Sequence, residues 1–285
     1  MAAEKLWVEA DRLAPRSQCV TRTNPRHPSW NEDRVLCDPL RGVAAIFDGL
    51  GGYAGGEAAA CAACGTLARF LLIIPAQEDV AGRSGWLRDA LEEAQNAISL
   101  SRQLHLDAPY QTCTATVLLL SGRKVLVANI GDSRAYRYSR SGGSGNLTDL
   151  TGPVKGMAGD EDRESLYVRL DEVSTHVELD NNERLRDLFM QRNIVPGVLA
   201  HVPGSFRSAV SVQEHDCETG DVFVICSDGV HDNLTGTEIQ ATIEEKLSGG
   251  ATAIVEALTS KAWLRSQEDH VRAKPDDISA ACLIG

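Results

Sequence analysis

The chain has 285 residues, of which 43% are hydrophobic and 24% charged, a composition typical of a soluble globular protein with a substantial core. Its net charge of −12 argues against nucleic acid or an anionic membrane as the main partner, because both need a basic surface. No apolar run is expected to span a membrane, and Met1–Trp7 lacks the pattern of a secretory signal, so we expect a cytoplasmic protein.

The first third of the chain is predicted to contain strands followed by helices. Residues 1–30 hold three prolines and several arginines, which is typical of a strand and an irregular loop. The apolar run 43–47 predicts a short buried strand that ends at Asp48. Two helices are then expected over 57–72 and 86–104, where Ala and Leu recur at helical spacing.

The middle of the chain changes to β-strand patterns. Residues 112–120 and 124–130 predict a hairpin, because two β-rich runs flank the turn Ser121-Gly122-Arg123. A second turn at 131–133 leads to a third strand over 134–138. We expect these three strands to be consecutive neighbours in one antiparallel sheet.

The last half contains one segment with little pattern and then a clear strand-and-helix series. Residues 140–205 carry many charges with weak periodicity, apart from a helix over 183–191, and predict a surface insertion. A buried strand is expected over 221–227, ending at Asp228. Two helices and a final strand follow, with Thr235 as the first N-cap, over 237–247, 252–264 and 278–284.

The hexapeptide Phe47–Gly52 places a carboxylate at the end of a buried strand and glycines directly after it. In a tight turn the Asp48 carboxylate and the Gly49 carbonyl can point the same way, and such hard oxygen donors suit Mg²⁺ or Mn²⁺. Taken alone, the hexapeptide fits an ordinary strand-to-helix turn better than a metal site.

Four aspartates share a position at the start or end of a strand-like run: Asp48, Asp132, Asp228 and Asp276. Acids at strand ends can converge on one rim of a sheet, whereas acids along helix faces would not. Converging carboxylates repel one another unless cations neutralise them. The residues therefore favour a metal site slightly over dispersed turn residues.

Six short motifs together resemble the PP2C (PPM) family of metal-dependent protein serine/threonine phosphatases, in both order and spacing. The motifs are Asn31-Glu32-Asp33, Phe47–Gly52, Thr112–Thr116, Asn129–Tyr136, Cys226–Asp232 and Pro275–Ser279. Each motif alone is weak, but six in register are not expected by chance. The resemblance extends from about Val20 to the end, with 140–205 matching only as a variable flap.

The resemblance implies an α+β fold in which two antiparallel β-sheets form a sandwich flanked by helices on both faces. It implies one phosphatase domain over residues 1–285, with the flap inserted at about 140–205. The strand and helix order predicted above is compatible with this α-β-β-α arrangement.

The resemblance also implies the roles of individual residues toward two Mg²⁺ or Mn²⁺ ions. Asp48 would bridge the ions and the Gly49 carbonyl would bind one of them, while Asp228 and Asp276 would bind the other. Asp33 would lie next to the ions with Glu32 and Asp277 supporting it. A weaker third ion is expected at Asp132 and Asp232.

Two ions roughly 3.5–4 Å apart can lower the pKa of a bridging water and hold it in line with a phosphate ester. We therefore expect hydrolysis of phosphoserine or phosphothreonine without a phosphoenzyme, which suits a chain without a Cys-x5-Arg signature. The expected partner is a phosphorylated protein, and we expect the chain to be a monomer.

The chain departs from the family pattern at two places near the expected site. The usual phosphate-binding Arg position holds Pro28, and we assign its role to Arg26, although a solvated loop Arg is an equal interpretation. Leu50 stands where many relatives carry a His. Two alternatives remain open: an inactive PP2C-like binding or regulatory module, and a two-metal hydrolase of a small phosphate ester.

Overall fold

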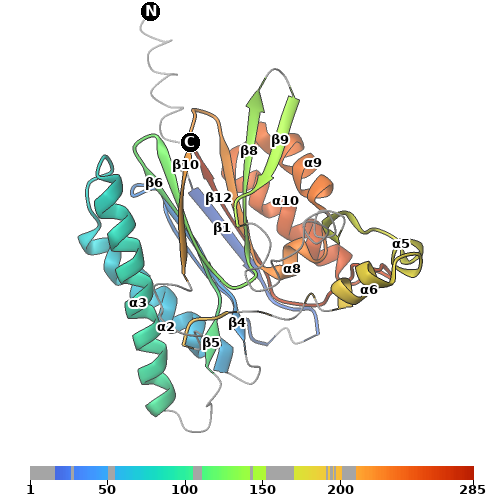
Figure 1. Ribbon diagram of the computed structural model, residues 1–285, viewed down its shortest axis with the longest axis horizontal. Helices are drawn as coiled ribbons and strands as arrows, with labels where there is room; N and C mark the ends of the chain where they lie inside the picture. The colour runs from blue at the N-terminus through green and yellow to red at the C-terminus, as the bar shows by residue number, and fades with distance from the viewer. Residues whose placement is uncertain are drawn as a thin grey trace, which may run out of the picture.

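Two five-stranded antiparallel sheets pack face to face at the centre of the chain (Figure 1). The computed structural model describes residues 17–26, 29–50, 55–104, 111–141, 144–151, 170–190, 192, 195, 197–200 and 210–285. The first sheet contains, in spatial order, β1 (Ser17–Arg22), β12 (Ile278–Ile284), β11 (Val222–Cys226), β8 (Arg134–Ser141) and β9 (Ser144–Asp149). The second contains β10 (Ser211–Asp216), β7 (Lys124–Ile130), β6 (Ala115–Ser121), β3 (Val43–Phe47) and β2 (Arg34–Asp38). A short ladder joins β4 (Gly49–Leu50) to β5 (Thr112–Cys113).

Helices cover the outer faces of both sheets, one pair on each side (Figure 1). The pair on the second sheet is α2 (Gly55–Phe70), continued by η2 (Leu71–Ile73), and α3 (Val80–Leu104). The pair on the first sheet is α9 (Gly236–Lys246), followed by η3 (Leu247–Gly249), and α10 (Gly250–Arg265). The shorter helices are α5 (His176–Asp180), α6 (Glu183–Met190) and α8 (Asp228–His231). The expected α-β-β-α fold is confirmed.

The alternation of side chains along each central strand explains why strands and helices form layers. On β3, Val43 and Phe47 pack with the helices α2 and α3, while Ala44 and Ile46 face the other sheet. Successive side chains of a strand point to opposite faces, and both faces of β3 are buried. A run that is apolar at every position is therefore what a central strand of this sandwich requires.

Helix α2 and its extension, Gly55–Ile73, are long and apolar enough to cross a membrane by length and composition alone, with a mean hydropathy of 1.4. The expectation that the chain has no such run was wrong. Several of its side chains, among them Ala59, Ala63 and Leu67, are fully buried against the second sheet and α3. The core thus accounts for part of its apolar character, whereas Leu72 and Ile73 at its end are exposed.

The structure corrects the predicted pairing of the middle strands. β6 and β7 form the expected hairpin around Gly122, but β8 pairs with β9 and β11 in the other sheet. The chain changes sheets at Gly131, whose φ of 113° is open to glycine but strained for other residues. The place beside β7 is taken by β10.

Other elements differ at their ends or were not expected. α3 begins at Val80, six residues before the predicted start, because the Asp79 side chain accepts the Gly82 N–H at 2.8 Å. The polar strands β9 and β10 and the short helix α5 were missed, since none has a continuous apolar pattern. The helix expected over 183–191 is confirmed as α6, with Gln191 outside the described residues.

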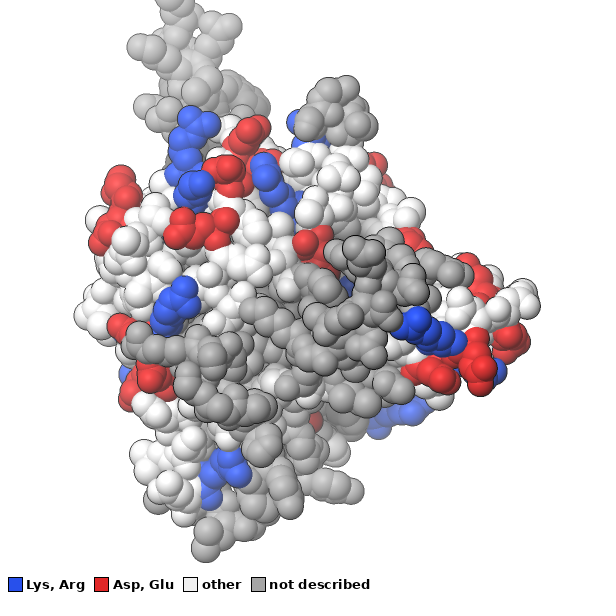
Figure 2. Space-filling view, viewed as in Figure 1, with Lys and Arg blue, Asp and Glu red and all other residues white. Residues whose placement is uncertain are grey.

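Acidic and basic side chains are interspersed over the described part of the face in Figure 2. The acidic side chains on this face are thus interspersed with lysines and arginines. The buried acids described next carry part of the chain's excess of negative charge.

Candidate metal centre

Asp48 directly follows the buried strand β3, and its main chain is held by Thr114, which lies between β5 and β6. The Thr114 N–H donates to the Asp48 carbonyl at 2.8 Å, and the Asp48 N–H donates to Thr114 Oγ1 at 3.2 Å. The side chain is 9% exposed. Burial raises the pKa of Asp48 well above its ordinary value, and nearby carboxylates add to this effect: Asp33, Asp228, Asp132 and Asp276.

Gly49 lies where three backbone segments meet. A Cβ at this position would lie 2.5 Å from the Gly56 main chain at the start of α2 and 2.6 Å from the Glu32 carbonyl. Only glycine allows this approach, so the residue fixes the path of the chain directly after Asp48. The following pair, Gly51 and Gly52, lies outside the described residues.

Asp33 stands just before β2 and is 1% exposed. Its Oδ2 accepts a hydrogen bond of 2.6 Å from the Ser279 hydroxyl on β12, which joins the two sheets at this end. Burial raises the pKa of Asp33 well above its ordinary value; the Ser279 hydrogen bond opposes this effect.

Asp277 uses both carboxylate oxygens to hold the loop that carries Glu32 and Asp33. Oδ1 accepts the Asn24 N–H and Oδ2 accepts the Glu32 N–H, each at 2.6 Å. The side chain is 4% exposed. Asp277 therefore connects the start of β12 with the loop before β2.

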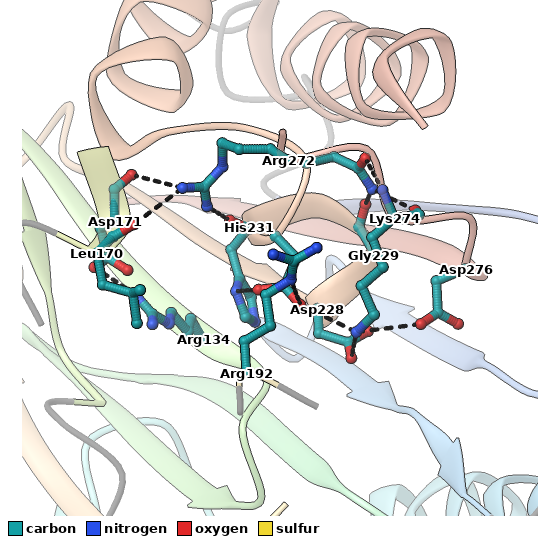
Figure 3. A network of polar contacts seen from close by, with 12 residues as sticks. Arg134, Leu170, Asp171, Arg192, Asp228, Gly229, His231, Arg272, Lys274 and Asp276 are labelled. Atoms are coloured by element: carbon teal, nitrogen blue, oxygen red, sulfur yellow. Dashed lines mark hydrogen bonds and ion pairs between the residues drawn. The ribbon is translucent and has the colours of Figure 1, made fainter. Parts of the chain in front are cut away.

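Three further aspartates surround the ammonium group of Lys274 (Figure 3). Lys274 Nζ contacts Asp228 Oδ2, lies 3.0 Å from Asp232 Oδ2 and lies 3.3 Å from Asp276 Oδ2. Burial favours the neutral amine, but the three carboxylates outweigh it and raise the pKa of Lys274 above its ordinary value. In the described part of the chain, no three His, Cys, Asp or Glu side chains already stand at a spacing that would hold an ion.

Asp132 lies in the turn between β7 and β8 and is 8% exposed. Neither of its carboxylate oxygens has a hydrogen-bond partner among the described residues. Burial and the charge of Asp228 raise its pKa to about 6. A buried carboxylate without a donor is costly, which indicates a site for a positively charged ligand.

A sequence model of protein phosphatase 2C matches residues 26–267. This chain belongs to the protein phosphatase 2C family. "Probable protein phosphatase 2C 61" of Arabidopsis thaliana is 28% identical over 203 residues, which are 67% of this chain and 60% of that protein. "Serine/threonine phosphatase stp" of Listeria welshimeri is 25% identical over 231 residues, 80% of this chain and 81% of that protein.

Solved structures share the PP2C fold over nearly the whole chain. Two crystal structures of the serine/threonine phosphatase PstP, one from Mycobacterium tuberculosis and one described with two manganese ions, each give a TM-score of 0.67. Their identities are 21% and 19%, and each covers 94% of this chain, with 97% and 96% of their own chains covered. At these identities the likeness shows the fold.

The carboxylates of this PP2C chain fit a hard divalent cation. The charges of Asp33, Asp132, Asp228 and Asp276 add to the raised pKa of Asp48, although these residues come from separate segments. Carboxylate and carbonyl oxygens are the donors that Mg²⁺ and Mn²⁺ prefer. The two unpartnered oxygens of Asp132 add donors of the same kind.

Arg26, predicted to bind phosphate in this PP2C chain, lies in the loop after β1. It is exposed and borders a hollow formed with Ser266–Glu268, Ala273 and Pro275. The Asn24 side chain accepts the Arg26 N–H at 2.8 Å and donates to the Pro275 carbonyl at 3.1 Å, so the two loops are linked. The assignment of Arg26 stays a prediction.

Sequence reasoning missed three cations of the PP2C site: Lys274, Arg192 and Arg272 (Figure 3). Arg192 Nε lies 3.7 Å from Asp232 Oδ2, and Arg272 Nη2 donates to the His231 carbonyl at 2.6 Å. A basic residue two positions before Asp276 was a usable signal for Lys274. Arg192 and Arg272 gave none, because only the fold brings them to α8.

Proposed function

We propose that this chain is a metal-dependent protein phosphatase that hydrolyses phosphoserine and phosphothreonine monoesters through two divalent cations, with a weaker third. The observation that carries the proposal is the convergence of buried aspartates from separate segments at one end of the sandwich, together with the two unpartnered oxygens of Asp132. Membership of the PP2C family and the names of its relatives support the same activity.

Asp48 would bind both cations, with the Gly49 carbonyl and Asp33 beside it, and Asp228 and Asp276 would bind the second. Asp132 and Asp232 would hold the third. When bound, the cations would lower the pKa of a water molecule and neutralise charge on the phosphate. The chain's own part is positioning, since Thr114, Ser279 and Asp277 fix the acids through hydrogen bonds of 2.6–3.2 Å.

The proposed substrate is a phosphorylated protein, which would approach over the segment 170–192 next to α8. This segment carries α5 and α6 and is joined to the site by Arg192 and Arg272. Arg26, at the rim of the hollow that it forms with Ser266–Glu268, is proposed to bind the phosphate or the peptide next to the phosphate.

The test is phosphate release from a phosphothreonine peptide with Mn²⁺ or Mg²⁺, with and without chelator. We expect metal-dependent release, and a loss of at least about 100-fold in Asp48→Asn because a ligand shared by both cations is weakened. Asp216→Asn is the matched control, since Asp216 lies on the edge strand β10 with a side chain that is 76% exposed.

Absence of turnover in a folded protein that still binds Mn²⁺ would contradict the catalytic proposal and favour a binding module. Small esters such as p-nitrophenyl phosphate provide the other comparison. Turnover of small esters without turnover of phosphopeptides would replace the protein substrate by a small phosphorylated molecule.

A further inference from the structure

The ammonium group of Lys274 occupies the space between acids that the proposed function assigns to metal binding. Its contacts are with the Oδ2 atoms of Asp228, Asp232 and Asp276, and its side chain is 12% exposed. While these contacts last, the lone pairs that the three oxygens direct toward Lys274 are not available to a cation. A cation and the ammonium group therefore cannot use Asp228 and Asp276 in the same way at the same time.

The main chain of Lys274 is fixed while its side chain has several rotatable bonds. Its N–H donates to Asn233 Oδ1 at 2.9 Å, and its carbonyl accepts from Asn233 Nδ2 at 2.8 Å. Asn233 is fully buried. The ammonium group can thus leave the aspartates by side-chain rotation, without movement of the loop that carries Asp276.

The acids keep partial compensation if Lys274 moves away. Arg192 Nε lies 3.7 Å from Asp232 Oδ2, and its guanidinium stacks over the Phe189 ring at 4.0 Å. Among the described residues, Lys274 is the only Lys or Arg within ion-pair distance of Asp228 and Asp276. These two residues are the ones that need a replacement cation.

We propose that Lys274 is an internal counter-ion of the metal centre: it holds Asp228 and Asp276 in the metal-free chain and is displaced when a divalent cation binds. The inference rests on the proposed function for the site that these residues form. The need to displace Lys274 lowers the affinity for the metal, because its contacts must first be broken. In the metal-free chain, the same contacts stabilise the fold by pairing buried carboxylates with a cation.

The test measures Mn²⁺ binding by isothermal titration calorimetry, after chelator treatment, for the native chain and for Lys274→Met. The substitution keeps roughly the length of the side chain and removes its charge. We expect Lys274→Met to bind Mn²⁺ at least about tenfold more tightly, since a neighbouring charge changes a carboxylate's affinity for a cation by about this factor or more. The melting temperature without metal should fall in the same variant.

Lys274→Gln removes the charge with a polar side chain and should also bind Mn²⁺ more tightly than the native chain, which tests the inference if Lys274→Met does not fold. Lys261→Met is the matched control, because Lys261 pairs with Glu245 on the helix surface with a side chain that is 44% exposed. Native-like or weaker Mn²⁺ binding by Lys274→Met would overturn the inference.

The outcomes also separate this inference from the proposed function. If neither the native chain nor Lys274→Met binds Mn²⁺, the metal centre itself is wrong and the inference fails with it. If both bind Mn²⁺ with equal affinity, the metal centre stands and only the role of Lys274 is overturned.

Discussion

The Asp277 carboxylate accepts the main-chain N–H of Glu32 at 2.6 Å, across the gap between the start of β12 and the loop before β2. Its other oxygen accepts the Asn24 N–H at the same distance. Two acceptors facing two N–H donors can be supplied by an aspartate but not by an asparagine, whose amide nitrogen is a donor. This pairing places Asp33, the residue after Glu32, next to Ser279.

Asp277→Asn should therefore lower the free energy of unfolding by about 1–3 kcal/mol, because one backbone N–H would lose its acceptor. We also expect weaker Mn²⁺ binding, since Asp33 would no longer be fixed. Urea unfolding and calorimetry measure the two effects, with Asp216→Asn as the control for the change of charge. Unchanged stability would show that a water molecule or another group serves the second N–H.

Gly49→Ala should disrupt the site and the fold together. The added Cβ would lie 2.5 Å from the Gly56 backbone and 2.6 Å from the Glu32 carbonyl, and neither can move as a side chain can. We expect a loss of stability of about 1–3 kcal/mol, as overpacking causes, and a loss of Mn²⁺ affinity.

Gly65→Ala is the matched comparison for Gly49→Ala. Gly65 lies inside α2, and a Cβ there would meet nothing within 4 Å. Removing glycine from a helix interior should raise stability by about 0.5–1 kcal/mol. Thermal unfolding should therefore shift in opposite directions in the two variants; a fall in both would contradict the packing argument.

The N-terminus of α9 should respond to pH through Glu238. Its carboxylate accepts the Thr235 N–H at 2.8 Å and pairs with Arg265 at 2.7 Å. Burial works against the ionised form, but these contacts lower the pKa of Glu238 below its ordinary value of 4.5. Its contribution to stability is thus present above pH 4.5 and is lost as the pH falls through the lowered folded-state pKa.

Urea unfolding should show that Glu238→Gln is less stable than the native chain at pH 7. Between pH 5 and pH 3 its free energy of unfolding should fall by less than that of the native chain, because the titrating group is gone. Thr235→Ala, which removes the other half of the capping box, should cost about 1 kcal/mol at all pH values. Glu256→Gln on the exposed side of α10 is the control. Parallel pH curves for Glu238→Gln and the native chain would refute the assignment.

Arg272 is a buried cation that joins the segment before α5 to α8 (Figure 3). It donates to the Leu170 carbonyl at 3.0 Å, the Val173 carbonyl at 3.1 Å and the His231 carbonyl at 2.6 Å. Only a guanidinium has the fork of donors that reaches several carbonyls at once. Arg272 therefore fixes residues 170–173 against α8.

Arg272→Lys should increase amide hydrogen exchange in 170–190 by at least about fivefold, since a local opening becomes easier by about 1 kcal/mol or more. Activity on a phosphopeptide should fall more than activity on a small phosphate ester. Arg186→Lys on the exposed face of α6 is the control. Equal exchange in the two variants would show that other contacts hold the segment.

Sequence alone determined the central strands and the helices that cover them. A run such as 43–47, apolar at every position, must be buried on both faces, and this burial also fixes where Asp48 emerges. Helices α9 and α10 follow from spacing and from the Thr235 cap. Local patterns decide such elements because their physical causes lie within a few residues.

The tertiary structure decided what depends on distant pairs. β8 leaves the sheet of β6 and β7 after the positive φ of Gly131 and pairs with β11, a strand about 90 residues further along the chain. The position of Lys274 among three aspartates, and that of Arg26 beside Pro275, depends on how separate loops meet. The motifs predict which acids form the site, but Coulomb interactions act through space, so only the folded chain shows which cations accompany them.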